Sequence, residues 1–142
     1  MKQGIQDIDV LLGSMDAELQ PGNYIFYTTN SAVFDPVVLE LNPIGFFREK
    51  EGMSFILEQT EADKSGIKYE SLYCLISLHV HSSLAAVGLT AAISGKLAAE
   101  NISANVVAAY YHDHIFVPKE KAEHALDAIK ELQFQHTYKG SV

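Results

Sequence analysis

The clearest hydrophobic pattern in the chain begins at residue 72 and predicts a strand that ends in two histidines. Residues 72–81 alternate between two sets of side chains, as in a strand with one buried face. The apolar set consists of Leu72, Cys74, Ile76, Leu78 and Val80, and the opposite set of Tyr73, Leu75, Ser77, His79 and His81. The first set predicts a core face and the second an open face.

A helix is predicted directly after this strand, over about residues 84–100. Its buried stripe at helical spacing consists of Ala86, Leu89, Thr90, Ile93 and Leu97. Ser82 or Ser83 can cap the first turn, and Asn101 can end the helix because asparagine tolerates the left-handed conformation. Gly88 lies one turn inside, where glycine costs about 1 kcal/mol relative to alanine, so it indicates close approach of another group.

The remaining C-terminal elements complete a known order. We expect a strand over 102–110, a turn, a strand over 114–117 and a helix over 119–132 that begins after Pro118. Strand–helix–strand–strand–helix is the body of a ferredoxin-like unit. Its first and third strands are central, antiparallel neighbours.

This topology gathers polar side chains at one place. His79 and His81 would lie beside His112 and His114, with all four imidazoles and Phe116 on the open face. The N-terminus of the following helix would be close to them, and helix N-termini favour anions.

The N-terminal half is patterned more weakly. We expect a short helix near residues 5–12, a strand over 24–29, and a helix or strand over 37–41. A hairpin over 44–59 and a short helix over 61–65 follow. This half looks like a degenerate copy of the other, with the boundary at Gly66.

Two stretches carry a family resemblance. HSSLAAVGLTAA (residues 81–92) and ISANVVAAYYHDHIFVP (residues 102–118) resemble the small bacterial proteins built from tandem ACT domains. The resemblance implies an α+β fold of two ferredoxin-like, βαββαβ-type units whose antiparallel sheets are covered on one face by helices. Residues 1–66 would form a degenerate ACT-like unit and residues 67–142 an ACT domain.

The resemblance also implies a function. ACT proteins are regulatory and bind small effectors, typically amino acids, at the loop after the first strand and at the following helix start. Carried over, this loop is His81, Ser82, Ser83, Leu84 and Gly88. ACT pockets usually form between paired units, within a tandem or across a dimer, and a homodimer is expected. Most ACT modules are fused to an enzyme, whereas we expect none in this chain, so a separate metabolic enzyme is a candidate partner.

Composition and charge narrow the classes of function. The chain has 142 residues, and its net charge of −8 argues against nucleic acid and anionic membranes as partners. No apolar run approaches the ~20 residues that span a bilayer, and the N-terminus lacks the pattern of a signal peptide. Cys74 is alone and buried in a predicted strand, which fits a cytoplasmic protein.

The polar residues allow different chemistries. His79, His81, His112 and His114 could bind a metal, contact a polar ligand or a partner, or be structural or solvated. No metal signature of fixed spacing is present, and we expect neither a metal nor a cofactor. Asp113 fits a turn carboxylate better than a general base.

Three functional hypotheses follow. The first is a non-catalytic sensor of amino acids or small carboxylates, in which the helix start at Leu84, Ser82 and Ser83 hold the ligand and the histidines supply a wall. The second is a structural or partner-binding dimerisation module with a vestigial pocket. The third is a metal-binding protein or metalloenzyme that uses the four histidines.

Overall fold

The computed structural model describes residues 5–79 and 88–140, and its contacts divide the chain into two compact units. Unit 1 consists of residues 1–20 and 75–142, and unit 2 of residues 21–74. Unit 2 is therefore inserted in the sequence of unit 1. The expected division into residues 1–66 and 67–142 describes halves along the sequence rather than contacts, and it stays a prediction.

Unit 1 has a ferredoxin-like strand order. Its sheet runs β1-β5-β7-β6, from β1 (Asp16–Leu19), β5 (Tyr73–His79), β7 (Asp113–Pro118) and β6 (Asn105–Ala108). The helices are α1 (Ile5–Ser14), α3 (Leu89–Ala99) and α4 (Ala122–Gly140), with a short 3-10 turn η2 (Lys119–Lys121) before α4. The sequence did not lead us to expect β1. This strand comes from the N-terminal end of the chain and pairs antiparallel with β5.

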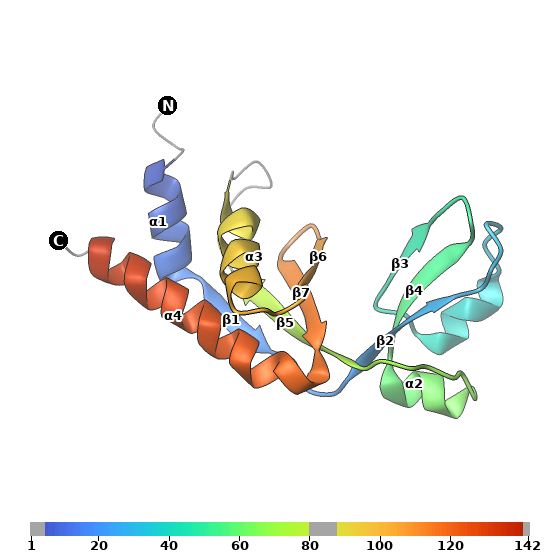
Figure 1. Ribbon diagram of the computed structural model, residues 1–142. Coiled ribbons are helices and arrows are strands. Elements are labelled where there is room, and N and C mark those ends of the chain that lie inside the picture. The colour runs from blue at the N-terminus through green and yellow to red at the C-terminus, as the bar shows by residue number, and fades with distance from the viewer. Residues whose placement is uncertain (1–4, 80–87, 141–142) are drawn as a thin grey trace. The chain divides into compact units, whose positions relative to one another are not determined.

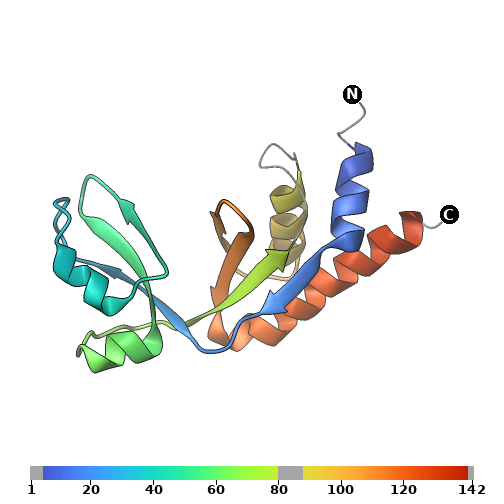
Figure 2. The same cartoon turned by 180° about the vertical axis from the view of Figure 1, so that it is seen from behind.

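The helices of unit 1 cover one face of its sheet. They lie in front of the strands in Figure 1 and behind them in Figure 2. The fully buried side chains of this unit include Leu12, Ile76, Leu78, Ile93, Leu97, Ile115, Val117, Ala125 and Ile129. Ile76 and Leu78 come from the apolar face predicted for 72–81, and Ala125 and Ile129 from the face predicted for 119–132, so both faces contribute to the core. Helix α4 continues beyond the predicted end at residue 132 to Gly140.

The other face of this sheet is more buried than predicted. Leu75, Ser77 and Phe116, which we expected on an open face, are only 8%, 3% and 2% exposed. β5 lies between β1 and β7, and β7 lies between β5 and β6, so both strands have neighbours on each side. Side chains of central strands are flanked by those of the adjacent strands, which alternation along one strand does not reveal.

Helix α3 starts later and ends where the sequence predicted. Gly88 has φ +94° and directly precedes the helix, so a continuous helix over 84–100 is wrong. At the other end Asn101 has φ +61°, and the N–H groups of Asn101 and Ile102 donate to the carbonyls of Ala98 and Leu97 (3.0 and 2.9 Å). This is a Schellman ending, which the left-handed tolerance of asparagine makes accessible.

Polar side chains connect the helices of unit 1. Lys96 Nζ of α3 donates to Glu131 Oε1 of α4 at 2.9 Å, and this hydrogen bond raises the pKa of Lys96. His124 of α4 bonds to Glu100 at 2.9 Å, which lowers the pKa of that carboxyl. Gln133 of α4 donates to the Leu12 carbonyl at the end of α1 (3.3 Å).

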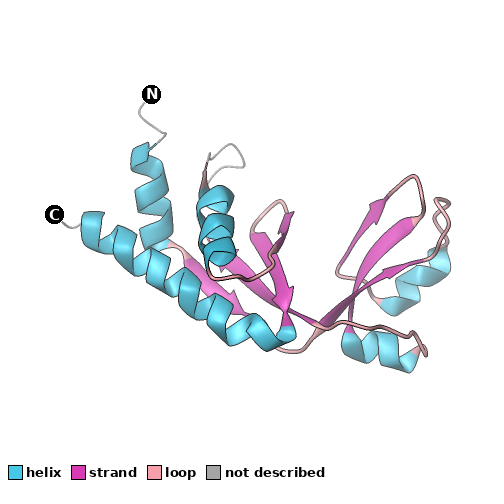
Figure 3. Ribbon diagram, viewed as in Figure 1, coloured by secondary structure: helices cyan, strands magenta, loops and turns pink. Residues whose placement is uncertain are grey.

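Unit 2 repeats the ferredoxin-like order. The strands β3 (Gly45–Arg48), β4 (Met53–Glu58) and β2 (Tyr24–Thr28) are antiparallel neighbours, and Tyr73 at the start of β5 pairs with Tyr24. The 3-10 helix η1 (Pro36–Leu41) and α2 (Gln59–Lys64) complete it (Figure 3). The predicted hairpin is confirmed, and residues 37–41 are helical.

The core of unit 2 shows that both of its helices cover the same face. Val38 of η1 and Ala62 of α2 pack against the inward residues of β2 and β4, which are Ile25, Met53, Phe55 and Leu57.

Two further observations bear on the predictions made from composition. Cys74 is buried, as expected. Within residues 5–79 and 88–140, none of the helices has both the length and the apolar character needed to cross a bilayer.

Candidate functional site

We predicted that the two strands with the histidines are adjacent in the sheet, and the structure of unit 1 confirms this. β5 and β7 are adjacent in the sheet. Ser77 Oγ lies 2.9 Å from His114 Nδ1, and the rings of His79 and His112 are 4.4 Å apart between centroids, with planes at 70°. Position 77 of β5 contacts position 114 of β7, and position 79 contacts position 112, directly before β7, so the two strands run antiparallel.

Electrostatics around these rings favours uncharged imidazole at His114. The ring of His112 lies between its neighbours, 6.4 Å from His114. Burial, and then the positive charge that His112 can carry, lower the pKa of His114, while Asp113 opposes this shift. Glu18 of β1 has a carboxylate oxygen 3.6 Å from His79 Nε2. Within the described part of the chain, the buried Nδ1 atom of His112 has no hydrogen-bond partner.

The cluster does not form a metal site as far as the structure describes it. Among residues 5–79 and 88–140, no group of three or more histidine, cysteine or carboxylate side chains is arranged to hold a metal ion. His81, Ser82, Ser83 and Leu84 lie outside the described residues. A ligand-binding role for His79, His112 and His114 stays a prediction.

Gly88 borders an apolar contact. A Cβ atom on Gly88 would come within 3.3 Å of the Ile8 Cδ1 atom of α1. The expected close approach at this glycine is therefore present, and the approaching group is an isoleucine of the same unit. The side chain of Ile8 therefore lies beside the start of α3.

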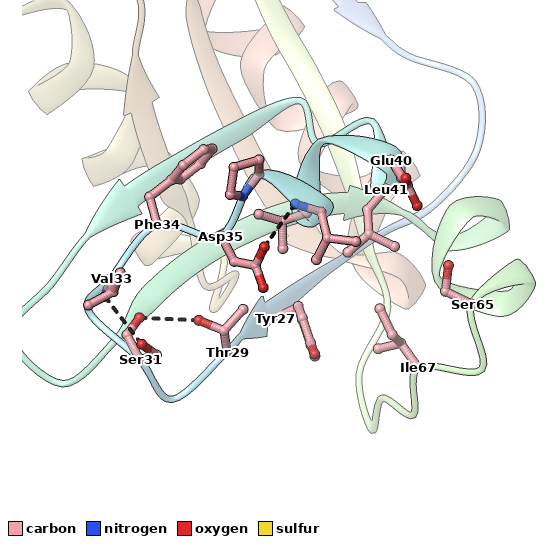
Figure 4. A pocket seen from close by; sticks show the side chains of 13 residues that line it. Tyr27, Thr29, Ser31, Val33, Phe34, Asp35, Glu40, Leu41, Ser65 and Ile67 are labelled. Atoms are coloured by element: carbon pink, nitrogen blue, oxygen red, sulfur yellow. Dashed lines mark hydrogen bonds between the residues drawn. The ribbon is translucent and has the colours of Figure 1, made fainter.

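Unit 2 contains an open pocket of about 740 Å³ that the sequence did not lead us to expect. It lies over the loop after β2, along η1, and against the end of α2. The lining residues are Tyr27, Thr29, Ser31, Val33, Phe34, Asp35, Pro36, Val37, Val38, Glu40, Leu41, Ser65 and Ile67. Figure 4 shows Ser31 and Val33 on one side and Ser65 and Ile67 on the other.

The loop at this pocket is held by its own hydrogen bonds. Asp35 Oδ1 accepts from the Val37 N–H at 3.0 Å and so caps η1. Ser31 Oγ accepts from the Val33 N–H, and Thr29 Oγ1 donates to the Ser31 carbonyl, both at 3.2 Å (Figure 4). An aspartate before a proline at the first helical position is a strong start signal, which explains why the chain turns here.

The β3–β4 turn fixes the same loop from the outside. The Met53 N–H donates to the Ser31 carbonyl at 2.8 Å, and the Thr29 N–H donates to the Met53 carbonyl at 3.2 Å. A Cβ atom on Gly52 would be 3.0 Å from both Asn30 Cα and Ser31 N, so the backbone can approach only because this residue is glycine. The pocket wall is thus positioned by backbone contacts.

One sequence signal could have located this pocket. The family resemblance puts the ligand at the loop after the first strand and at the next helix start. We applied that rule only to residues 81–88, where the family motif is clear. The corresponding segment of unit 2 is 29–36, which follows β2 and includes the first residue of η1. The rule applies there equally, although the motif letters do not match.

The chain is similar to known domains over most of its length. Residues 3–74 match one model of the ACT domain, and residues 70–131 match another. A crystal structure of a Vibrio cholerae protein of unknown function, described as a possible transport protein, is 51% identical. The similarity covers 92% of this chain and 98% of that one, with a TM-score of 0.81.

More distant solved structures share the fold alone. The ligand-free regulatory subunit of aspartate kinase from Thermus thermophilus is 14% identical over 82% of this chain and 95% of that one, with a TM-score of 0.62. A protein from Agrobacterium tumefaciens is 15% identical over 84% and 89%, with a TM-score of 0.61. Comparison with curated proteins finds no match.

Proposed function

Because this chain belongs to the ACT-domain family, we propose that it is a non-catalytic regulatory protein and that it binds a small organic effector in the pocket of unit 2. One observation carries the choice of site. The pocket occupies the loop after the first strand and the start of the first helix of its unit, and its volume of about 740 Å³ is in the range of small-molecule sites.

The lining suits a small ligand that has both apolar and polar groups. Phe34, Val37 and Ile67 offer apolar contacts, while the hydroxyl groups of Ser31 and Ser65 offer hydrogen bonds. A few polar groups in an apolar wall are the usual composition of a specific site. The loop of unit 1 with His81, Ser82, Ser83, Leu84 and Gly88 remains a second predicted site, with His79, His112 and His114 as its wall.

Regulation requires that binding favours one state of the protein over another. We propose that the output is association, with a second copy of the chain or with a metabolic enzyme. β3 is an edge strand of the unit 2 sheet, and its Phe46 and Phe47 are 56% and 72% exposed. Edge strands are natural pairing surfaces, so the alternative of a plain dimerisation module also has support here.

The experiment is a ligand screen with matched pocket variants. Isothermal calorimetry on the purified full chain would test the twenty amino acids with related amines and carboxylic acids. A Ser65→Trp variant fills the pocket from the α2 side, and Ser71→Trp places the same side chain on an exposed residue away from it.

We expect at least one compound to bind the wild type and Ser71→Trp, with binding lost in Ser65→Trp. A ligand at about 100 times its Kd also raises the free energy of unfolding by about 2.7 kcal/mol, which thermal unfolding can detect. The proposal fails if no compound binds, or if Ser65→Trp binds as well as the wild type. Dimerisation that no compound alters would favour the plain dimerisation module instead.

A further inference from the structure

The charged side chains around the unit 2 pocket have one sign. Asp35 and Glu40 line it, and among the described residues no lysine, arginine or histidine does. The nearest basic residues in sequence are Lys64 and Lys68, which flank the lining residues Ser65 and Ile67 but do not line the pocket themselves. Lys64 lies 3.8 Å from Glu61. The pocket therefore offers negative charge without a fixed positive partner.

The helix start at this pocket is already occupied. Asp35 Oδ1 accepts the Val37 N–H at 3.0 Å, and the Asp35 carbonyl accepts the Val38 N–H at 3.1 Å. A ligand carboxylate would have to displace the aspartate and then lie beside its charge. Like charges at close range repel each other. The second oxygen of Asp35, in contrast, accepts no hydrogen bond from the described residues and can accept one from a ligand.

The apolar part of the wall sets a second requirement. Val33, Phe34 and Val37 are exposed at the pocket, and the ring centroids of Phe34 and Phe46 are 5.8 Å apart, with the planes tilted at 40°. A ligand that covers these groups removes apolar surface from water. A bare metal ion or ammonium would leave this surface exposed, so the ligand needs an apolar body as well as a positive charge.

From this arrangement we infer that the pocket of unit 2 takes a small organic cation, an amine with an apolar body and no carboxylate, rather than a zwitterionic amino acid or an organic acid. This inference rests on the proposed function, whose ligand it narrows. The amine donates to Asp35, Glu40 lies on the η1 side of the same pocket, and the hydrocarbon part covers Val33, Phe34 and Val37. The net charge of −8 on the whole chain favours the approach of such cations.

The test uses compounds that differ only in the carboxylate or the amine. For the branched body these are 3-methylbutylamine, leucine and 4-methylpentanoate, and for the aromatic body phenethylamine, phenylalanine and 3-phenylpropanoate. The affinities are measured by calorimetry on the full chain at low salt. Within each series we expect the amino acid to bind about tenfold more weakly than the amine, and the acid about tenfold more weakly than the amino acid. Raising the ionic strength should weaken the binding of the amine to the protein.

Charge-neutral variants assign the effect to the pocket. Asp35→Asn keeps an oxygen that can cap η1 and removes the charge, and Glu40→Gln removes the other charge. Each should weaken amine binding by about tenfold, while Glu51→Gln, an exposed glutamate that does not line the pocket, should change it by less than about twofold.

The outcomes separate this inference from the proposed function. If the amino acid or the acid binds as tightly as the amine, the inference that the ligand is an amine is wrong, while the proposed binding site is not contradicted. If the amine binds equally well to Asp35→Asn, Glu40→Gln and Ser65→Trp, the pocket is not where it binds and both fail. If none of the six compounds or the wider screen binds, both fail as well.

Discussion

At the scale of single residues, His114 combines burial with a specific partner. Its Nδ1 atom lies 2.9 Å from the Ser77 hydroxyl, and Ser77 is a buried polar side chain on β5. Buried polar groups require partners, so this pair satisfies Ser77 inside the sheet. The neighbouring ring of His112 makes a positive charge on His114 less favourable. This part of unit 1 is therefore built for neutral imidazole.

The stability of the protein should consequently fall in mild acid. The pKa of His114 is lowered in the folded chain, mainly by burial, relative to its ordinary value near 6.5 in the unfolded chain. The unfolded chain then binds more protons, so the contribution is fully present above about pH 6.5 and is lost as the pH falls through the folded pKa. Urea unfolding at pH 7.5, 6.5 and 5.5 measures this loss.

Replacing the titrating group supplies the comparison. His114→Gln retains a polar side chain that does not titrate, and its stability should depend less on pH over this range. His124→Gln changes a histidine on the exposed side of α4 and keeps the contribution of His114. The stability of this variant should therefore fall more steeply in mild acid than that of His114→Gln. Equal pH dependence in the wild type and His114→Gln would rule out His114 as the cause.

At the scale of elements, the pocket depends on how the β3–β4 turn holds the loop after β2. Met53 exchanges backbone hydrogen bonds with Thr29 and Ser31 on this loop. Gly52 lies against Asn30 and Ser31 more closely than a side chain would allow. The hairpin and the loop therefore act as one structural element, and the ligand site is formed by backbone packing as much as by side chains.

A methyl group at this contact should disturb both stability and binding. Gly52→Ala would place a Cβ atom 3.0 Å from two backbone atoms that cannot move independently, and we expect a loss of about 1–3 kcal/mol in the free energy of unfolding. Because Ser31 must shift, affinity for the effector should fall as well. Urea unfolding and calorimetry measure the two effects.

Gly45→Ala is the matched control in the same hairpin. A Cβ atom there meets only Ile56 Cδ1, at 3.7 Å, which is ordinary contact. This variant should stay within about 0.5 kcal/mol of the wild type. If Gly52→Ala were equally well tolerated, the close backbone contact would not matter for the pocket.

At the scale of the molecule, the order of the chain differs from the order of its compact units. β1 and α1 belong to unit 1, although most of unit 2 separates them from β5 in sequence. Asp16 pairs with His79 and Leu19 with Ile76, and Gln133 of α4 donates to the Leu12 carbonyl. The C-terminal half therefore needs the first twenty residues to complete its sheet and its helical layer.

Two fragments should behave differently as a result. A chain of residues 67–142 lacks β1 and α1, which leaves one edge of β5 unpaired and part of α4 uncovered, and we expect it not to unfold cooperatively. A permuted chain, with residues 75–142 joined by a flexible linker to residues 1–20, contains all of unit 1 and should unfold cooperatively. Circular dichroism in a urea titration distinguishes them, and a cooperative transition of the shorter fragment would contradict this account.

The sequence alone determined what depends on local pattern and turn chemistry. The apolar alternation of residues 72–78 indicated a core strand, Asn101 the end of α3, and the residues around Gly52 a hairpin, because each signal acts within a few positions of the chain. The strand order and the alternation of side chains then predicted that His79 and His112 would lie side by side, and they do.

Only the tertiary structure decided which distant segments complete each unit. The four residues of β1 carry no strand signal of their own, and their pairing with β5 comes from contacts across some sixty positions of sequence. The burial of Phe116 and the pocket over Asp35 likewise depend on neighbours supplied by other strands and loops. Periodicity reports how side chains alternate along one element, whereas burial and cavities arise from the surfaces that several elements bring together.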